Sequence, residues 1–442
     1  MKTRRLLIGA LAVAIAAWPM AAGVSAQTKE VFIPLLVYRT GPYAPSGVPI
    51  ANGFVDYFTL LNERDGGING VKVTWEECET QYATDKGVEC YERLKGKGPM
   101  GAALVNPYST GITYQLIPKA AVDKVPVFSM GYGMTAAADG RWFPWVFNFP
   151  TTYWSQASAV IRFIGQKEGG LDKLKGKKIA HVFHNSPYGK EANPTLEELA
   201  RKLGFELTLL PVDHPGQEQK ATWLQIRRLK PDWIFMSGWG VMNQVAIKEA
   251  AAINYPMDHF IGNWWSASDA DVVPAGDGAR GYIGATFHAP GTGFKIHQEI
   301  FKYVYDKGKG AGEKSRVGEV LYNRGLINSM LGTEAIRTAQ GKFGKKPLTG
   351  EQVRWGFENL NLTEQRLDQL GMKGFTHPVK VTCEDHEGAG PVMFEQWDGK
   401  KWSIVSDWVP TMKDVVRPKI EAAAVEEGKK LGYTVRDCSK EK

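Results

Sequence analysis

The sequence predicts an α/β protein made of two doubly wound parallel-sheet units in tandem. Apolar, β-branched segments alternate with segments of helical spacing, and this alternation starts again near residue 156. The chain has 442 residues, of which 43% are hydrophobic and 23% charged. That length suffices for two or three domains with cores of their own. The composition excludes a disordered chain and a small disulfide-stapled scaffold.

The first unit is expected to open with a buried strand rich in β-branched and aromatic residues. Its expected strands are 31–38, 71–75, 102–105 and 125–130, and its expected helices are 50–62, 85–94 and 112–122. Gly-rich turns separate them, as at 65–70. Strands that alternate with helices in this order indicate a parallel sheet covered on both faces.

The second unit repeats the pattern. Its expected helices are 156–168, 195–203, 223–229 and 243–253, and its expected strands are 178–184, 205–210, 233–237 and 259–262. Beyond Gly281 the spacing predicts helices at 297–306 and 318–340. The chain is then expected to end in strand-like pieces at 379–383, 392–396 and 402–405.

Residues 1–26 have the pattern of a secretory signal peptide. A basic start is followed by the apolar run 6–17 and by the small-residue end Val24-Ser25-Ala26. The alternative, a membrane anchor, is disfavoured because the run is short for a bilayer span. The formal charge is +7, and Lys2, Arg4 and Arg5 contribute three of it, leaving +4 after cleavage. This mild, scattered charge argues against a nucleic-acid partner.

The four cysteines fit an exported protein with two disulfides. Three pairings are possible, and the local one, Cys78 with Cys90 and Cys383 with Cys438, is the simplest. No Cys-x-x-Cys occurs, so neither a zinc ribbon nor a redox motif is indicated.

Catalytic and cofactor motifs are scarce. The sequence holds no Walker loop, no His-Glu-x-x-His and no Gly-x-Ser-x-Gly. A Gly-x-Gly-x-x-Gly string at 276–281 follows a loop rather than a strand, unlike a dinucleotide site. The eight histidines do not pair at metal-binding spacings. We therefore expect no enzyme activity, no cofactor and no metal.

Several strands stop in a polar, Gly-rich and aromatic tip. These tips are 38–43, 106–110, 129–133, 184–189, 238–240 and 263–265. In open parallel sheets, ligands bind outside the carboxyl ends of the strands. Any single tip could be an ordinary turn, but six tips on two units predict a small-molecule cleft between the units.

At this point the chain resembles the periplasmic solute-binding proteins of ABC importers, of the leucine/isoleucine/valine-binding type. The resemblance covers essentially the whole mature chain. It is carried by Thr40-Gly41-Pro42, the turn 62–70, the Cys78/Cys90 region, Val125-Pro126-Val127-Phe128, Tyr188-Gly189, Pro231-Asp232-Trp233 and the late segment 378–386.

The resemblance implies two lobes joined by a three-stranded hinge, with crossovers near 147–153, 287–290 and 372–378. It implies a first lobe of 27–149 with 288–375, and a second lobe of 150–287 with 376–442. It also implies a monomer in the periplasm that closes on a small solute and docks on an inner-membrane permease. Two alternatives stay open: a ligand-sensing partner of a membrane receptor, and an amino-acid ligand.

Amino-acid binders of this family typically hold the α-carboxylate at the tips after the third and fourth strands. They meet the ammonium with an acid after a Phe-x-Gly strand. Here Phe260-Ile261-Gly262 is followed by Asn263, Trp264 and Trp265, so the acid is missing. A buried ammonium without a carboxylate costs desolvation energy, which favours an aromatic carboxylate as ligand. The candidate ligand-binding residues are Tyr43, Asn106, Tyr108, Ser109, Ser129, Gly131, Tyr132, Tyr153, Tyr188, Trp239, Asn263, Trp264 and Trp265.

Overall fold

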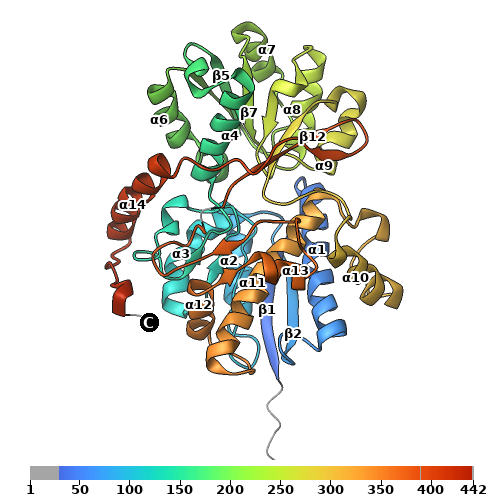
Figure 1. Ribbon diagram of the computed structural model, residues 1–442, viewed down its shortest axis with the longest axis vertical. Helices are drawn as coiled ribbons and strands as arrows, with labels where there is room; N and C mark the ends of the chain where they lie inside the picture. Colours follow the sequence, from blue (N-terminus) through green and yellow to red (C-terminus); the bar gives the residue numbers. More distant parts are fainter. Residues whose placement is uncertain (1–28, 389, 441–442) are drawn as a thin grey trace, which may run out of the picture.

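The computed structural model describes residues 29–388 and 390–440. They form two α/β lobes, stacked one above the other in Figure 1. The expected signal peptide at 1–26 lies outside the described residues. Because each lobe has its own sheet and helices, the predicted tandem α/β architecture is confirmed.

The first lobe has a discontinuous sheet. Strands β1 (Glu30–Val37) and β2 (Lys72–Glu79) pair in parallel over their whole length, and β3 (Val127–Phe128) pairs with β4 (Val146–Phe147). The expected strand 102–105 makes only single bridges, such as Phe32 with Ala102. The helices are α1 (Ala44–Asp65), α2 (Thr84–Leu94), α3 (Thr110–Asp123), α10 (Lys295–Tyr303), α11 (Val320–Phe343), α12 (Gly350–Glu358) and α13 (Glu364–Gln369).

Helices α1 and α11 form the centre of this lobe. They touch at Gly53 and Gly325, where an added Cβ would lie 2.2 Å from a backbone oxygen of the facing helix. Only glycine permits this approach, since any side chain there would push the helices apart.

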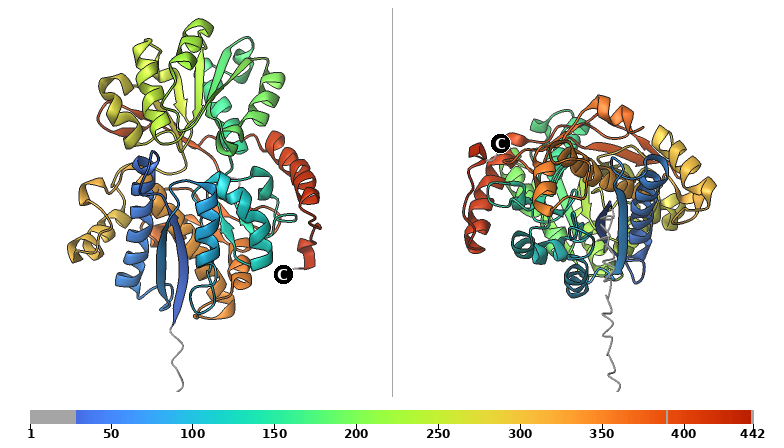
Figure 2. Two further views of the ribbon diagram at one scale, coloured as in Figure 1. Left: turned by 180° about the vertical axis from the view of Figure 1, so that it is seen from behind. Right: turned by 90° about the horizontal axis from the view of Figure 1, so that it is seen from below.

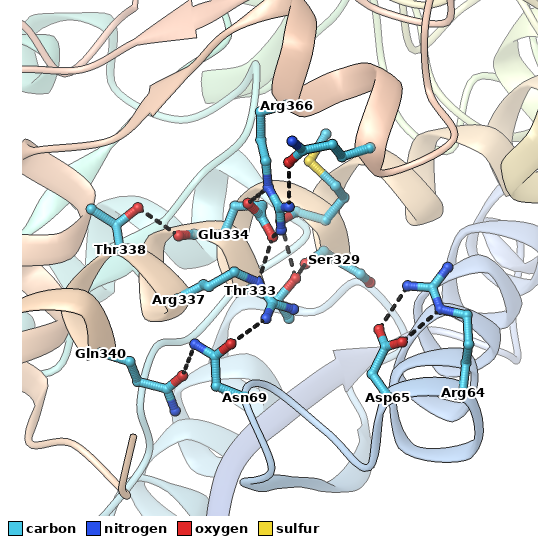
Figure 3. A network of polar contacts seen from close by, with 12 residues as sticks. Arg64, Asp65, Asn69, Ser329, Thr333, Glu334, Arg337, Thr338, Gln340 and Arg366 are labelled. Atoms are coloured by element: carbon cyan, nitrogen blue, oxygen red, sulfur yellow. Dashed lines mark hydrogen bonds and ion pairs between the residues drawn. The ribbon is translucent and has the colours of Figure 1, made fainter. Parts of the chain in front are cut away.

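A polar network ties α11 to its surroundings (Figure 3). Glu334, buried on α11, accepts hydrogen bonds from Arg366 at 2.7 Å and from Arg337 at 2.9 Å. Arg337 also donates to Asn69, whose amide donates to Gln340 at 2.9 Å. Two guanidinium groups thus balance the buried carboxylate and fix α13 and the turn before β2 onto α11.

The second lobe holds a continuous seven-stranded sheet of order β13-β12-β9-β8-β7-β5-β6. Strands β5 (Lys178–His184), β6 (Glu206–Val212), β7 (Trp233–Ser237), β8 (Phe260–Gly262) and β9 (Ile283–Thr286) are parallel, and β12 (Met393–Trp397) and β13 (Trp402–Ile404) are antiparallel. Its helices are α4 (Tyr153–Glu168), α5 (Pro187–Lys190), α6 (Asn193–Leu203), α7 (Lys220–Leu229), α8 (Val241–Ala252) and α9 (Asp269–Val272). The strand order reverses between β5 and β7, which is where open parallel sheets bind ligands.

The segment after Pro378 differs from its expected place in the second lobe. Strand β11 (Val379–Lys380) pairs with β10 (Asn361–Leu362), which follows α12 of the first lobe. His386 is buried against Phe147, with ring centroids 4.2 Å apart. The chain therefore packs on the first lobe up to about residue 388, through the pairing of β11 with β10 and the contact of His386 with Phe147. The other lobe boundaries stay a prediction.

The C-terminal part also differs, because it contains a helix that the sequence analysis missed. Helix α14 (Lys413–Lys430) runs along the side of both lobes (Figures 1 and 2). It contacts the short helix η1 (Thr135–Ala138) of the first lobe and α4 of the second. Disulfides join Cys78 to Cys90 and Cys383 to Cys438, which confirms the local pairing and fixes the C-terminus to the first lobe.

Candidate ligand-binding site

A cavity lies between the two lobes, at the carboxyl ends of the strands. About 280 Å³ within it is not occupied by protein atoms, open solvent at its mouth included, and only about 20 Å³ admits the centre of a water-sized sphere. Eight of its ten lining residues are tyrosine or tryptophan. The lining residues are Tyr38, Tyr82, Tyr108, Ser109, Thr110, Tyr132, Tyr153, Tyr188, Trp239 and Trp265.

The first-lobe wall combines phenol rings with the start of a helix. Ser109 caps the N-terminus of α3, where its hydroxyl accepts the N–H of Ile112 at 3.4 Å. Thr110 is the first residue of this helix and also lines the cavity. Unpaired N–H groups and the positive end of the helix dipole make such a terminus favourable for an anion.

The second-lobe wall is made of rings alone. Tyr153 begins α4, Tyr188 lies in α5, and Trp239 and Trp265 follow β7 and β8. The two indoles meet edge to face, with ring centroids 5.6 Å apart. The Tyr188 hydroxyl contacts Gly238 O at 2.8 Å and Asn263 Oδ1 at 3.0 Å. These bonds fix the ring, so this wall presents a rigid aromatic surface.

The cavity is electrically neutral. None of its ten lining residues carries an ionic side chain. Burial raises the pKa of Tyr38, Tyr108, Tyr132, Tyr153 and Tyr188 well above the ordinary value, so these phenols are protonated. The hydroxyl of Tyr108 is buried without a hydrogen-bond partner among the described residues.

A buried arginine supports the indole wall from behind. The guanidinium of Arg324, on α11, lies 5.2 Å from the Trp265 ring centroid. It donates to Trp264 O at 2.7 Å and to His288 Nε2 at 2.8 Å. Through these contacts Arg324 positions the Trp264–Trp265 tip. Arg324 itself does not line the cavity.

Seven of the thirteen candidate residues line the cavity: Tyr108, Ser109, Tyr132, Tyr153, Tyr188, Trp239 and Trp265. Tyr43 lines a groove that adjoins the cavity and shares Tyr82, Ser109 and Tyr188 with it.

The other five candidates hold the lining in place. Asn106 accepts the N–H of Tyr108 at 3.0 Å, and Ser129 accepts an amide hydrogen of Asn148 at 2.9 Å. Gly131 O accepts the indole N–H of Trp264 at 2.7 Å. Asn263 accepts the N–H of Trp265 at 3.0 Å. Trp264 is fully buried and stacks on Tyr153.

Three lining residues were not among the candidates. Tyr38 and Thr110 lie within predicted tips but were not selected. Tyr82 lies outside every predicted tip because β2 was expected to end at Trp75, whereas it runs to Glu79. The half-buried, partly acidic end of β2 has no clean strand pattern. The left-handed backbone at Gln81 and Tyr82 marks the true tip.

The lobes touch directly around the cavity. Tyr43 OH lies 3.0 Å from His184 Nε2, and the Trp264–Gly131 bond also joins one lobe to the other. Burial, together with nearby His214, lowers the pKa of His184 to about 4, so this imidazole is neutral at pH 7. The structure is therefore a closed form of the two lobes.

Among residues 29–388 and 390–440, no cluster of three or more His, Cys, Asp or Glu is placed to hold a metal ion. No helix in this part of the chain combines the length and apolarity needed to cross a membrane.

Comparison with known proteins defines the class of protein. A family model described as "periplasmic binding protein" matches residues 30–401, and the chain belongs to this family. It is thus the substrate-binding component of an ABC transporter, a class that takes a small-molecule ligand and a permease partner and works in the periplasm. The family consists of transport proteins rather than enzymes. A search of curated proteins found no match.

Solved structures support the assignment. The chain is similar to a protein described as an ABC transporter permease from the Pseudomonas fluorescens group, at 44% identity and TM-score 0.87, with 93% of this chain and 100% of that one covered. It also shares its fold with a Thermus thermophilus branched-chain amino acid ABC transporter with bound valine, at 20% identity, TM-score 0.74 and coverage of 89% and 99%. A solute-binding protein from R. palustris in complex with benzoate matches at 16% identity, TM-score 0.66 and coverage of 87% and 97%.

Proposed function

We propose that this protein captures a small aromatic carboxylate between its lobes and delivers it to the permease. The observation that carries the proposal is the composition of the cavity, which has eight aromatic rings and no charged side chain. A flat ring would pack against Trp239 and Trp265. Its carboxylate would meet the start of α3 on the opposite wall.

The same composition argues against an amino-acid ligand. An α-ammonium group enclosed here would face phenols and indoles but no carboxylate. Cation–π contact offsets about 2 kcal/mol when desolvated, whereas leaving a buried charge without an ionic partner costs more. A carboxylate has no ionic partner here either, but the hydroxyls of Ser109, Thr110 and Tyr108 and the N-terminus of α3 can stabilise its negative charge.

The function is tested by a thermal-shift screen of the purified mature protein. A ligand at 100 times its Kd adds about 2.7 kcal/mol to stability, which is a clear rise in Tm. We expect benzoate and 4-hydroxybenzoate to raise Tm and valine and leucine to leave it unchanged. A rise with the amino acids alone would replace the aromatic proposal by amino-acid transport.

The monomeric state and the signal peptide at 1–26 belong to the same proposal. Size-exclusion chromatography with light scattering checks the first, and N-terminal sequencing of exported protein checks the second. Genetic linkage to a receptor kinase in place of a permease would favour the sensing alternative.

A further inference from the structure

Glu191 reaches across the cleft outside the aromatic cavity. It directly follows α5 in the second lobe and is only 8% exposed. One carboxylate oxygen accepts the hydroxyl of Tyr114, on α3 of the first lobe. The other accepts the hydroxyl of Thr135 at 2.7 Å and its N–H at 3.3 Å. A single second-lobe side chain thus receives three first-lobe donors.

The two short segments that make this contact also line the cavity. On α3, Thr110 lines the cavity and Tyr114 lies one turn later. Beyond α5, Glu191 lies three residues after Tyr188, which lines the opposite wall. Residues three or four apart share a helix face. A ligand that draws Thr110 and Tyr188 together therefore also brings Tyr114 and Glu191 together.

We propose that Glu191 is a positioning residue that holds the lobes closed over the ligand through its contacts with Tyr114 and Thr135. Measuring this role by ligand affinity rests on the proposed function, because it needs an aromatic acid that binds. The contact between the lobes does not depend on the identity of the ligand. Glu191 is not among the residues that line the cavity, so its side chain affects binding through closure.

The surroundings of Glu191 determine its pH response. Trp154 of α4 donates its indole N–H to the Glu191 backbone oxygen at 2.7 Å. Lys190 shares a groove with Glu191. From α14, Lys419 lies over the Trp154 ring and bonds to Glu198, and Glu427 faces Tyr114. No ion pair to the Glu191 carboxylate is found among the described residues.

Burial raises the pKa of Glu191 to about 7, and the bonds from Tyr114 and Thr135 offset this only in part. In the open form the carboxyl meets water and titrates near its ordinary value. A group whose pKa is raised on closing favours the closed form most below the open-form pKa. This contribution is lost as the pH rises through about 7.

The test compares Glu191→Gln and Glu191→Ala with wild type, using 4-hydroxybenzoate as probe in calorimetric titrations. Glutamine resembles the protonated acid and keeps the contacts, so its affinity at pH 5.5 should equal or exceed that of wild type. The Kd ratio of wild type to Glu191→Gln should rise about ten-fold from pH 5.5 to pH 8. His184 contributes equally to both proteins and cancels in this ratio. Glu191→Ala should bind about ten-fold more weakly at pH 5.5.

A matched control and a ligand-free measurement complete the test. The control variant is Glu198→Gln, on α6 of the same lobe. The ratio of the wild-type Kd to its Kd should stay constant from pH 5.5 to pH 8. Small-angle scattering of the ligand-free proteins at pH 5.5 should show a larger radius of gyration for Glu191→Ala than for wild type. The proposal would be overturned if the ratio of the wild-type Kd to the Glu191→Gln Kd did not change with pH. It would also be overturned if ligand-free wild type and Glu191→Ala had equal radii of gyration. If no aromatic acid binds wild type, the proposed function fails while the scattering result still decides the role of Glu191.

Discussion

The two walls of the cavity come from equivalent ends of two α/β lobes, yet they differ in chemistry. The first-lobe wall offers hydroxyls and the N-terminus of α3, and the second-lobe wall offers rings, two of them indoles. The first wall can hold the charged end of a ligand and the second its flat body. Such a division is what the proposed aromatic carboxylate would need from a cavity without an ionic side chain.

The largest effect is expected from the indole wall. Trp265→Ala removes a ring that would cover the ligand and also uncovers the guanidinium of Arg324. Truncation of a central aromatic contact costs about 2–4 kcal/mol of binding free energy, so affinity for 4-hydroxybenzoate should fall about 100-fold by calorimetry. An affinity within a few-fold of wild type would mean that the ligand lies wholly against the first lobe.

The rim contact between Tyr43 and His184 should make closure weaker in acid. The pKa of His184 is lowered to about 4 in the closed form, and we expect it to rise when the lobes open because the ring then meets water. Closure is therefore supported above about pH 6.5, and this support is lost as the pH falls toward 4. Relative to His184→Gln, wild type should lose about ten-fold in affinity between pH 7.5 and pH 5. An unchanged ratio of the two affinities would exclude this role.

The hydroxyl of Ser109 serves both the helix and the cavity. Ser109→Ala removes a helix N-cap, worth about 1 kcal/mol of stability, and a donor toward the carboxylate. We expect a small drop in Tm without ligand and about ten-fold weaker binding of benzoate. Benzamide, which has no charge, should be affected less. Equal losses for the two probes would place the carboxylate elsewhere.

The smallest effect is expected at Tyr108. Its hydroxyl is buried and unpartnered among the described residues, so Tyr108→Phe should leave the Tm of the ligand-free protein unchanged or slightly raised. Binding of 4-hydroxybenzoate should weaken a few-fold if the hydroxyl contacts the ligand. Affinity equal to wild type would show that this hydroxyl is not used.

The sequence was most informative where the hydrophobic pattern was continuous. Strands β5 and β7 begin and end at the predicted residues, because both are buried and bounded by clear turns. Helix α14 was missed because Pro418 lies inside it and only one narrow face is buried. The contact of 379–388 with the first lobe depends on packing around His386 and Phe147, and a single sequence does not reveal that contact.

The sequence predicts those parts of the site that lie just beyond the ends of buried strands. Trp239 and Trp265 lie two and three residues beyond the buried strands β7 and β8, and both line the cavity. Residues such as Asn263 and Trp264 share the same tips but point into the supporting layer. Because the tips are turns without the regular alternation of a strand, the sequence identifies a tip more easily than the side chain that faces the ligand. Glu191 had no sequence signal, because its partners lie on the other lobe.

The two cavity tryptophans give the protein an intrinsic optical reporter. Trp239 and Trp265 are two of fourteen tryptophans in the chain, and both are shielded from water. An aromatic acid seated against them would lie within range to quench their emission or accept their excitation energy. Binding could then be followed by fluorescence without any label, and the change in signal would come from the ligand-facing wall itself.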